Sequence, residues 1–264
     1  RVSRGGAEVS FEADYFSANA EGYAAFRPRY PRSLLALLAD LCVRNERAWD
    51  CATGSGQAAT GLMEHFLQVI ATDASAEQIA RAPRHERIEY RTARAEESGI
   101  EGGSVDCVTV AQALHWFDLP AFYAEAARVL RPDGLLAVWC YATQTVDDPA
   151  IDALVHELYE ETLGPWWTPE RRHVEQGYRS LPFPFPEVPL PPFEIVASLD
   201  LARLVGYLCT WSAVGRCREA TGRDVVAELA PRLVRAWGDP AVTRRVCWPV
   251  HVRAGRAPAA FAQP

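Results

Sequence analysis

A glycine-rich turn, Gly54-Ser55-Gly56, follows a short apolar run that carries one acid, Asp50. Glycine adopts backbone angles closed to other residues, and its missing side chain lets a ligand lie against backbone N–H groups. Nineteen residues after Gly54, Asp73 follows a second apolar run. An acid at that spacing, at the end of the next strand, is placed to bind the ribose hydroxyls of a nucleoside. Alone, the turn also fits a plain loop, and Asp50 either orients it or faces a cationic ligand group.

Two further segments, 92–97 (TARAEE) and 110–118 (VAQALHWFD), follow later apolar runs. In the first, the Ala95 N–H and the Glu96 carboxylate bracket an adenine edge, or the segment forms a solvated acidic turn. Open parallel sheets bind ligands beyond the carboxyl ends of their strands, which places the second segment at the crevice. There His115 acts as a base or hydrogen-bond donor, or it only packs beside the neighbouring tryptophan.

Alternating patterns predict the elements that position these residues. Strands are expected at 47–52, 67–72, 87–92, 105–111 and 134–141, with helices at 57–66, 75–82 and 119–130. Ser75 and Gln78 form a capping-box pattern, and Ser33 is expected to cap an earlier helix that ends at Val43. Strands that alternate with helices predict an α/β fold with a parallel sheet and helices on both faces.

The pattern changes after about residue 142. Residues 149–163 read as helix, and the proline-dense segment 181–193 must be extended. Two more strands, 193–199 and 245–252, enclose helical stretches at 201–212 and 223–237, which gives seven strands with a helical insertion before the sixth. We expect one domain over residues 1–264. Its parts are an N-terminal cap segment at 1–31 with a helix before Arg27, a cofactor-binding core at 32–141, a cap insertion at 142–192, and 193–255, which completes the sheet.

Composition narrows the class of protein. The 264 residues carry a net charge of −7, which argues against a nucleic-acid partner because phosphate recognition needs a basic surface. The seven cysteines form no C-x-x-C pair, and we interpret them as buried free thiols of a cytoplasmic protein. No apolar run is long enough to span a membrane, and the six histidines lack metal-ligand spacing.

Five ordered motifs together resemble class I S-adenosylmethionine-dependent methyltransferases. They are Asp50-Cys-Ala-Thr-Gly-Ser-Gly-Gln57, Asp73, Ala95-Glu96, Gln112-Ala-Leu-His-Trp-Phe117 and Arg128-Val-Leu-Arg-Pro-Asp-Gly134. The resemblance is closest to a small-molecule branch that includes trans-aconitate-methyltransferase-like proteins, and it covers about residues 11–255. Two positions depart from the family pattern: Ala52 replaces a motif glycine, and Arg94 stands where an acid often precedes the alanine that contacts adenine.

The resemblance implies a Rossmann-like, seven-stranded sheet whose last strand is antiparallel, with S-adenosylmethionine across the ends of the first and fourth strands. The cofactor-binding residues it implies are Tyr23, Arg27, Asp50, Ala52, Gly54, Ser55, Gly56, Asp73, Ala74, Ala95, Glu96, Gln112, His115 and Trp116. His115 and Tyr178 are the catalytic candidates. Aromatic side chains suit a sulfonium through cation–π attraction, or they pack in the core. The candidates are Tyr15, Phe16, Tyr23, Trp116 and Tyr178. Arginines clamp a carboxylate, or they are solvated at the surface. The candidates are Arg27, Arg171, Arg172 and Arg216.

The leading hypothesis is in-line methyl transfer to a small-molecule acceptor, with no metal. An alternative keeps S-adenosylmethionine but directs a nucleophile at its aminobutyryl chain, by cyclisation or transfer, and releases methylthioadenosine. A third reading is a cofactor-binding module that serves a partner protein. The acceptor and the oligomeric state stay open.

Overall fold

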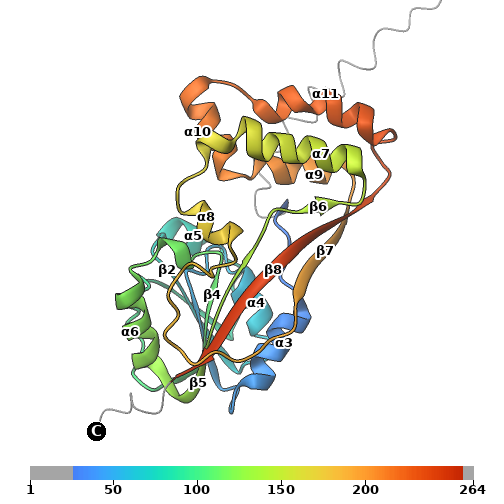
Figure 1. The fold of residues 1–264 in the computed structure, drawn as a ribbon. Helices are drawn as coiled ribbons and strands as arrows, with labels where there is room; N and C mark the ends of the chain where they lie inside the picture. The colour runs from blue at the N-terminus through green and yellow to red at the C-terminus, as the bar shows by residue number, and fades with distance from the viewer. Residues whose placement is uncertain (1–25, 258–264) are drawn as a thin grey trace, which may run out of the picture. The chain divides into compact units, whose positions relative to one another are not determined.

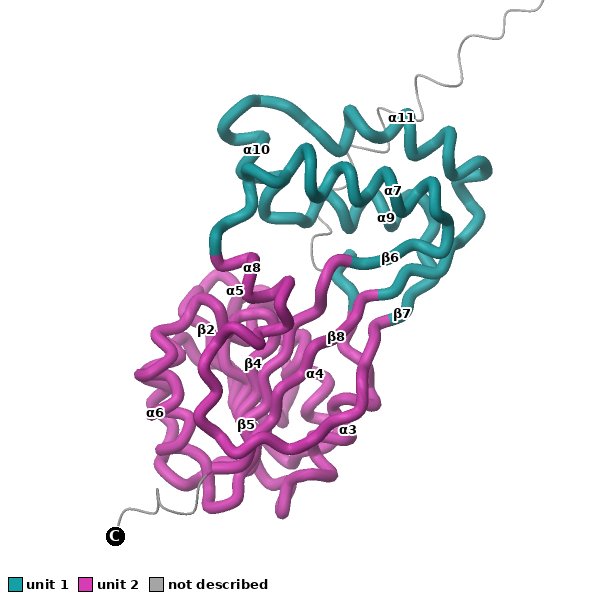
Figure 2. Tube along the Cα trace, in the orientation of Figure 1, with its two compact units in different colours: residues 1–28, 144–169, 196–247 teal, residues 29–143, 170–195, 248–264 magenta. Residues whose placement is uncertain are grey.

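The computed structural model describes residues 26–257, and these divide into two compact units (Figure 2). The sheet unit contains residues 29–143, 170–195 and 248–257, and the helical unit contains 26–28, 144–169 and 196–247. The range 142–192, expected as one insertion, is therefore divided between them. The single-domain organisation stays a prediction. The expected helix before Arg27 and the candidates Tyr15, Phe16 and Tyr23 lie outside the described residues.

The sheet confirms the predicted α/β class. Its strands are β1 (Arg47–Cys51), β2 (Gln68–Asp73), β3 (Ile88–Thr92), β4 (Val105–Ala111), β5 (Leu130–Tyr141), β6 (Thr145–Val146), β7 (Phe193–Leu199) and β8 (Arg244–Arg256). Strands β3, β2, β1, β4 and β5 run parallel in that order, β8 pairs antiparallel with β5, and β7 pairs with β8. All seven predicted strands are present. The short β6, which pairs with Val246 and Cys247 of β8, was not predicted.

Helices cover both faces of the parallel strands (Figure 1). They are α3 (Arg32–Leu41) and α4 (Gln57–Leu62) on one side and α6 (Leu119–Val129) on the other, while α5 (Ala76–Arg81) packs against β2 and β3. Because both faces are covered, the strands are continuous apolar runs, and Trp49, Val69 and Val108 have no exposed surface. Leu34 and Leu38 of α3 are equally buried.

Of the two expected N-caps, the structure contradicts Ser33 and confirms Ser75. The Ser33 prediction is wrong: α3 begins one residue earlier, and Pro31 is its N-cap, with a carbonyl that accepts the Leu34 N–H at 3.1 Å. The proline ring fixes φ at −61°, which suits that position without a side-chain cap. Ser75 does cap α5, because its Oγ accepts the Gln78 N–H at 3.3 Å. The reciprocal half of the capping box is replaced, since the Ser75 N–H donates to Asp73.

A later segment completes the layer that contains α6. Residues 93–104 join β3 to β4 without a helix. The side chains of Val174, Tyr178 and Phe185 pack in the same buried cluster as Phe122 of α6. The first of them lies on α8 (Arg171–Glu175), and the proline-dense segment that follows contains no helix. Its Val188 N–H donates to the Ala254 carbonyl of β8 at 2.8 Å, so this segment is fixed along the sheet.

Six helical elements are described in the helical unit. They are α7 (Pro149–Glu157), which continues as the π-helical η2 (Leu158–Thr162), then η3 (Gly164–Trp166), α9 (Leu201–Cys209), α10 (Ser212–Thr221) and α11 (Val225–Trp237). Aspartates at 148, 200 and 224 cap α7, α9 and α11. The Trp211 ring lies at the centre of an aromatic cluster with Tyr159, Trp167 and Tyr207. The separate helix α10 was not predicted.

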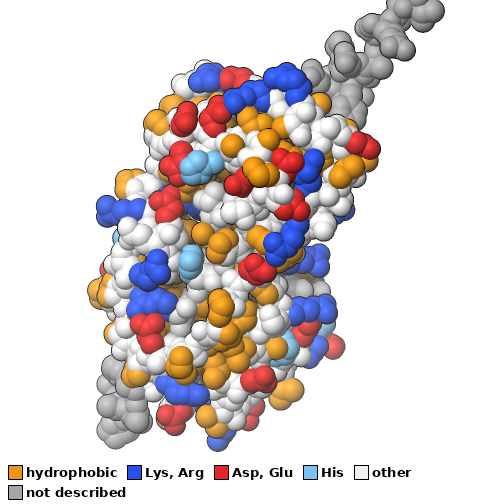
Figure 3. Space-filling view, turned by 45° about the vertical axis from the view of Figure 1, so that its right-hand side comes forward, with side chains coloured by type: hydrophobic (Ala, Val, Ile, Leu, Met, Phe, Trp, Pro, Cys, Tyr) orange, Lys and Arg blue, Asp and Glu red, His pale blue; other side chains and the backbone are white. Residues whose placement is uncertain are grey.

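Other chemical features of the described residues are few. All seven cysteines are free thiols, and five of them are buried. Among residues 26–257 no helix is long and apolar enough to cross a membrane, and no three His, Cys, Asp or Glu side chains gather as metal ligands. Over the face drawn in Figure 3, basic and acidic side chains are interspersed.

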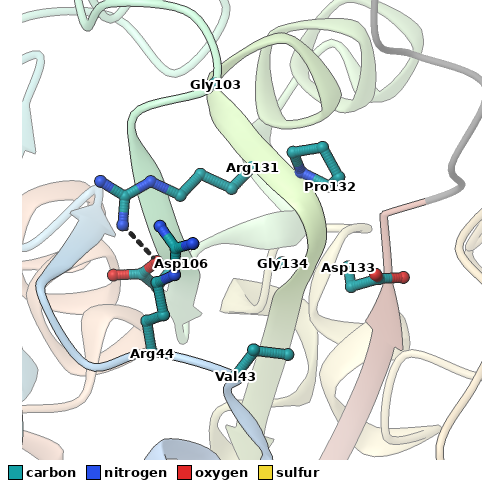
Figure 4. Close-up of a pocket in the computed structure, with 8 residues that line it drawn as sticks. All are labelled: Val43, Arg44, Gly103, Asp106, Arg131, Pro132, Asp133 and Gly134. Atoms are coloured by element: carbon teal, nitrogen blue, oxygen red, sulfur yellow. Dashed lines mark hydrogen bonds and ion pairs between the residues drawn. The ribbon is translucent and has the colours of Figure 1, made fainter.

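One buried carboxylate ties the amino-terminal ends of three strands together. Asp106 of β4 accepts the backbone N–H groups of Glu46 and Arg47, both at 2.9 Å, and it pairs with Arg131 at 2.6 Å (Figure 4). It is only 4% exposed. It also lines a cleft of about 460 Å³ beside Gly134 at this edge. Ligands of parallel sheets bind at the opposite, carboxyl edge, so we interpret Asp106 as a structural link.

Replacing Asp106 by Ala leaves the Glu46 and Arg47 N–H groups without their acceptor and breaks one of the two ion pairs of Arg131, which keeps Glu46 at 2.9 Å. We expect a loss of about 3 kcal/mol in the free energy of unfolding, measured by urea titration. The matched control is Glu89→Ala, which breaks the more exposed pair with Arg91 and is expected to cost less than about 1 kcal/mol. Equal, small losses in both variants would contradict the structural role.

Candidate functional site

The carboxyl ends of β1, β2 and β4 lie side by side. Cys51 pairs with Thr72 on one side and with Val110 on the other, so the residues that follow share one edge of the sheet. Ala52 and Gln112 stand at this edge with left-handed backbones, at φ 54° and 59°. Such angles cost non-glycine residues about 1–2 kcal/mol and occur preferentially at functional sites. The left-handed angle at Ala52 also explains why a glycine suits this position of the motif.

Asp73 joins the glycine turn to the end of β2. One carboxylate oxygen accepts the Gly54 N–H at 2.8 Å, and the other accepts the Ser75 N–H at 2.8 Å. Gly54 has φ 57°, and a side chain built there would find no atom within 4 Å. The acid therefore lies against the turn, beside a glycine with open space in front of it. The spacing of the two residues predicted that Asp73 binds the ribose of a nucleoside, and that role stays a prediction.

Gly56 has a different task from Gly54. Its φ is 83°, and an added Cβ would lie 2.4 Å from the Tyr90 hydroxyl of β3. Gly56 is the N-cap of α4, so its missing side chain lets that helix begin close against the neighbouring strand. Ser55, between the two glycines, is half-buried.

Asp50 is turned into the protein. It has no exposed surface, and its carboxylate accepts the hydroxyls of Thr53 at 2.5 Å and Thr109 at 2.9 Å. Burial is the largest effect on the Asp50 carboxyl and raises its pKa to about 6. The two hydroxyls and the Ala59 backbone lower this pKa, and the nearby charge of Asp73 raises it to a smaller extent. Its geometry fits the alternative in which Asp50 orients the turn.

The loop after β3 is anchored from α6. Ala95 is 9% exposed, and the Glu96 carboxylate accepts the Asp118 N–H at 3.1 Å and pairs with Arg94 at 3.2 Å. The loop is fixed further by the buried Glu125, which accepts the Ser98 N–H at 2.9 Å. Glu96 thus bridges its own loop and the start of α6. Arg94, which stands where the family pattern often has an acid, thus has Glu96 as its ion-pair partner.

His115 and Tyr178, 63 positions apart, meet in the sheet unit. His115 lies on the short helix η1 (Leu114–Trp116), and its Nδ1 is 3.0 Å from the Tyr178 hydroxyl. Burial, with smaller effects of Arg171 and His173, lowers the His115 pKa to about 4, so the imidazole is neutral at pH 7. Tyr178 has no exposed surface, so direct contact with a ligand is not open to it.

The remaining candidates differ in position. Trp116 is 58% exposed and its ring lies 4.7 Å from that of His115. Gln112 donates to the Tyr141 carbonyl at 3.4 Å, while its buried Oε1 has no hydrogen-bond partner. Ala74 is exposed. Two arginines lie in the helical unit, where Arg27 donates to the Thr210 carbonyl and Arg216 to the Trp166 carbonyl.

Three residues that organise the site were missed from the sequence. Thr53 and Thr109 bind Asp50, and Glu125 anchors the loop after β3. Thr109 had a signal, because it is a polar residue inside the apolar run of β4. Glu125 stands three residues before its ion-pair partner Arg128, but nothing in the sequence points to Ser98.

Comparison with known proteins decides the family. Residues 49–138 match a family model described as a methyltransferase domain. A protein of Dictyostelium discoideum, assigned as a methyltransferase, is 34% identical over 227 residues, which cover 85% of this chain and 86% of the relative. The chain belongs to the methyltransferase family.

A solved structure and a fungal relative extend this result. A protein of Anaeromyxobacter dehalogenans, assigned as a type II methyltransferase, is 49% identical, with a TM-score of 0.83 over 88% of this chain and 98% of that one. The methyltransferase pgmE of Aspergillus terreus is 30% identical over 159 residues, 54% of this chain and 48% of the relative. With the Rossmann-like sheet, these findings make the protein a class I S-adenosylmethionine-dependent methyltransferase, as the motifs predicted. Its membership of the trans-aconitate branch stays a prediction.

A side chain at Gly56 would clash with the Tyr90 hydroxyl unless the Tyr90 ring moves. We expect Gly56→Ala to lower the free energy of unfolding by about 2–3 kcal/mol, from the clash and the positive φ. Tyr90→Phe alone is expected to cost little, because the hydroxyl is buried without a partner among the described residues. In the double variant, Tyr90→Phe removes the hydroxyl oxygen that lies nearest to the added methyl group, so we expect it to restore part of the lost free energy of unfolding. Additive losses in the double variant would contradict the close approach.

Ionised Asp50 is expected to destabilise the methyltransferase at neutral pH. The carboxyl has its ordinary pKa of 3.8 in the unfolded chain and a pKa of about 6 in the folded protein, so the free energy of unfolding falls as pH rises between these values. The cost above pH 6 is about 3 kcal/mol. Asp50→Asn should therefore gain about 2 kcal/mol on wild type between pH 4.5 and pH 7.5, by urea unfolding at both. The exposed Asp133→Asn is the control, and a pH-independent difference for Asp50→Asn would refute the burial effect.

Proposed function

We propose that the methyltransferase binds S-adenosylmethionine at the carboxyl edge of β1, β2 and β4 and methylates a small-molecule acceptor there. The observation that carries this proposal is the hydrogen bond between the Asp73 carboxylate and the Gly54 N–H. This bond holds Asp73, whose carboxylate is suited to ribose hydroxyls, against the glycine-rich turn, whose backbone is bare of side chains at Gly54 and Gly56. A Cβ built at Gly54 would meet no atom within 4 Å, which supports the close approach of a ligand to this stretch of backbone.

The other residues of this edge fit the same cofactor. Gln112 has a buried Oε1 without a partner, which supports a role as acceptor for a ligand N–H group or ammonium. The buried Ala95 and the fixed Glu96 support an adenine contact beyond β3. The proposed cofactor-binding set keeps Ala52, Ser55 and Ala74 as neighbours of these groups. Tyr23 and Arg27 stay predictions, as does a cytoplasmic location.

S-adenosylmethionine supplies a methyl group already activated by a sulfonium, so the chain's contribution is to position the acceptor and exclude water. The exposed Trp116 ring suits contact with a cation or an apolar acceptor at this edge. His115, neutral at pH 7, is placed to orient the acceptor or the cofactor by a hydrogen bond. The alternative use of the aminobutyryl chain has no observation in its favour.

Cofactor binding tests the proposal directly. Isothermal titration with S-adenosylhomocysteine is expected to show binding that Asp73→Asn weakens about 10- to 100-fold, because a charged hydrogen-bond acceptor is lost. Asp133→Asn removes an exposed acid at the amino-terminal edge and should bind as wild type does. Thermal unfolding of both variants shows whether the turn is intact. Absence of binding by the wild type, or equal affinities for all three proteins, would overturn the assignment of this edge.

Product analysis identifies the reaction. With a panel of small acids, phenols, amines and thiols, we expect S-adenosylhomocysteine and a product heavier by one methylene, read by mass spectrometry. Release of methylthioadenosine instead would exclude methyl transfer as the reaction.

A further inference from the structure

The backbone of Tyr178, which forms a hydrogen bond with His115, is fixed by several contacts. The Tyr178 backbone is left-handed, at φ 61°, which bulky residues adopt only when the surroundings fix it. Its N–H donates to the His173 carbonyl at 2.7 Å, and its carbonyl accepts from Arg253 at 3.1 Å. Arg253 is itself held by Glu187 and lies 4.7 Å from the centre of the Phe183 ring. The tyrosine is therefore fixed from several directions before it contacts His115.

The protons of this pair can be assigned from the groups available. Burial raises the pKa of Tyr178 well above its ordinary value, so its hydroxyl keeps its proton at neutral pH. That O–H has no exposed surface, and Nδ1 of His115 is the acceptor within hydrogen-bond distance among the described residues. If Nδ1 carried the proton instead, the buried hydroxyl hydrogen would have no acceptor, which is unfavourable. A neutral imidazole with an unprotonated Nδ1 carries its proton on Nε2.

We propose that Tyr178 is a positioning residue that holds His115 as the neutral Nε2–H tautomer, so that His115 donates a hydrogen bond to the bound ligand and does not act as a base. This rests on the proposed function only in placing the ligand at the same edge of the sheet. The group recognised is an acceptor atom, such as an oxygen, on either the methyl acceptor or the cofactor. The reacting atom of the acceptor must then present its lone pair without giving a proton to His115.

The charges around the pair favour the neutral form. Arg171 and His173, on α8, oppose a positive charge on His115, and the acidic Glu170 favours it to a smaller extent. On the tyrosine side, the buried Cys140 thiol of β5 and Tyr30 disfavour a phenolate, and the Leu114 backbone and Arg171 favour it to a smaller extent, so burial leaves the pKa of Tyr178 raised. The bond between a neutral imidazole and a neutral phenol is thus the form that both sets of neighbours support.

Nitrogen NMR of the whole 15N-labelled chain measures the tautomer without cofactor or acceptor. At pH 7 we expect the His115 Nδ1 to resonate as an unprotonated nitrogen and its Nε2 as a protonated one, with His115→Gln used to assign the signals. Tyr178→Phe fits the buried volume but lacks the hydroxyl, and we expect the two tautomers to mix. The matched control is Ser180→Ala, which removes the hydroxyl 2.8 Å from Nδ1 of His173 and should leave His115 unchanged. A protonated Nδ1 in the wild type would overturn the proposal, even if S-adenosylhomocysteine binds.

Kinetic measurements on His115 variants show whether His115 acts as a hydrogen-bond donor or as a base. They also show whether it bonds to the methyl acceptor or to the cofactor. Glutamine keeps an N–H donor and alanine does not, so we expect His115→Gln to retain at least 10-fold more kcat/KM than His115→Ala. Equal losses in both variants would indicate that His115 is a base and refute the proposal. If His115→Ala raises the Kd of S-adenosylhomocysteine, the bond goes to the cofactor, and if it raises only the KM of the acceptor, the bond goes to the acceptor. Failure of all cofactor binding would refute the proposed function and leave the tautomer result standing.

Discussion

The hydrogen bond from the Gly54 N–H to Asp73 is the interaction on which the site depends. The same carboxylate accepts the Ser75 N–H, and the Ser75 hydroxyl then caps α5. One side chain therefore fixes the glycine turn, the end of β2 and the start of the next helix. The positive φ of Gly54 and the parallel register of β1 and β2 are both needed to bring the N–H to the acid. The edge is thus organised before any ligand arrives, which lowers the cost of ordering it on binding.

Backbone strain gathers at the same edge. Four non-glycine residues among the described ones have positive φ, and Ala52, Gln112 and Tyr178 either end a strand at this edge or contact a residue there. The sheet can hold such angles because its buried strands pair on both sides and fix the chain up to the last residue. Asp133 is the exception, because it lies in the irregularly paired first part of β5 at the opposite edge, and aspartate tolerates a left-handed backbone.

The sequence predicted what depends on local pattern and failed where distant loops meet. Strands buried on both faces and helices with one apolar face leave clear periodic signals, and all seven expected strands are present. The Gly54–Asp73 contact was also accessible, because spacing alone brings adjacent strand ends together. By contrast, the bond between His115 and Tyr178 depends on how the segment after α8 packs beside α6, which no periodicity records. Helix α10 was missed for a local reason, since its N-cap is Trp211 with no side-chain bond, whereas aspartates mark α7, α9 and α11.

Asp50 and Asp73, the two acids at this edge, differ in how many hydrogen-bond positions they leave for a ligand. An ionised carboxylate has about four lone-pair positions. Asp50 uses its oxygens on Thr53, Thr109 and the Ala59 backbone and has no exposed surface, so no position is left for a ligand. Asp73 is half-buried and gives one position on each oxygen to a backbone N–H, which leaves about two. Two adjacent hydroxyls are what a ribose presents, so the bonds that fix Asp73 leave it the capacity that a nucleoside requires.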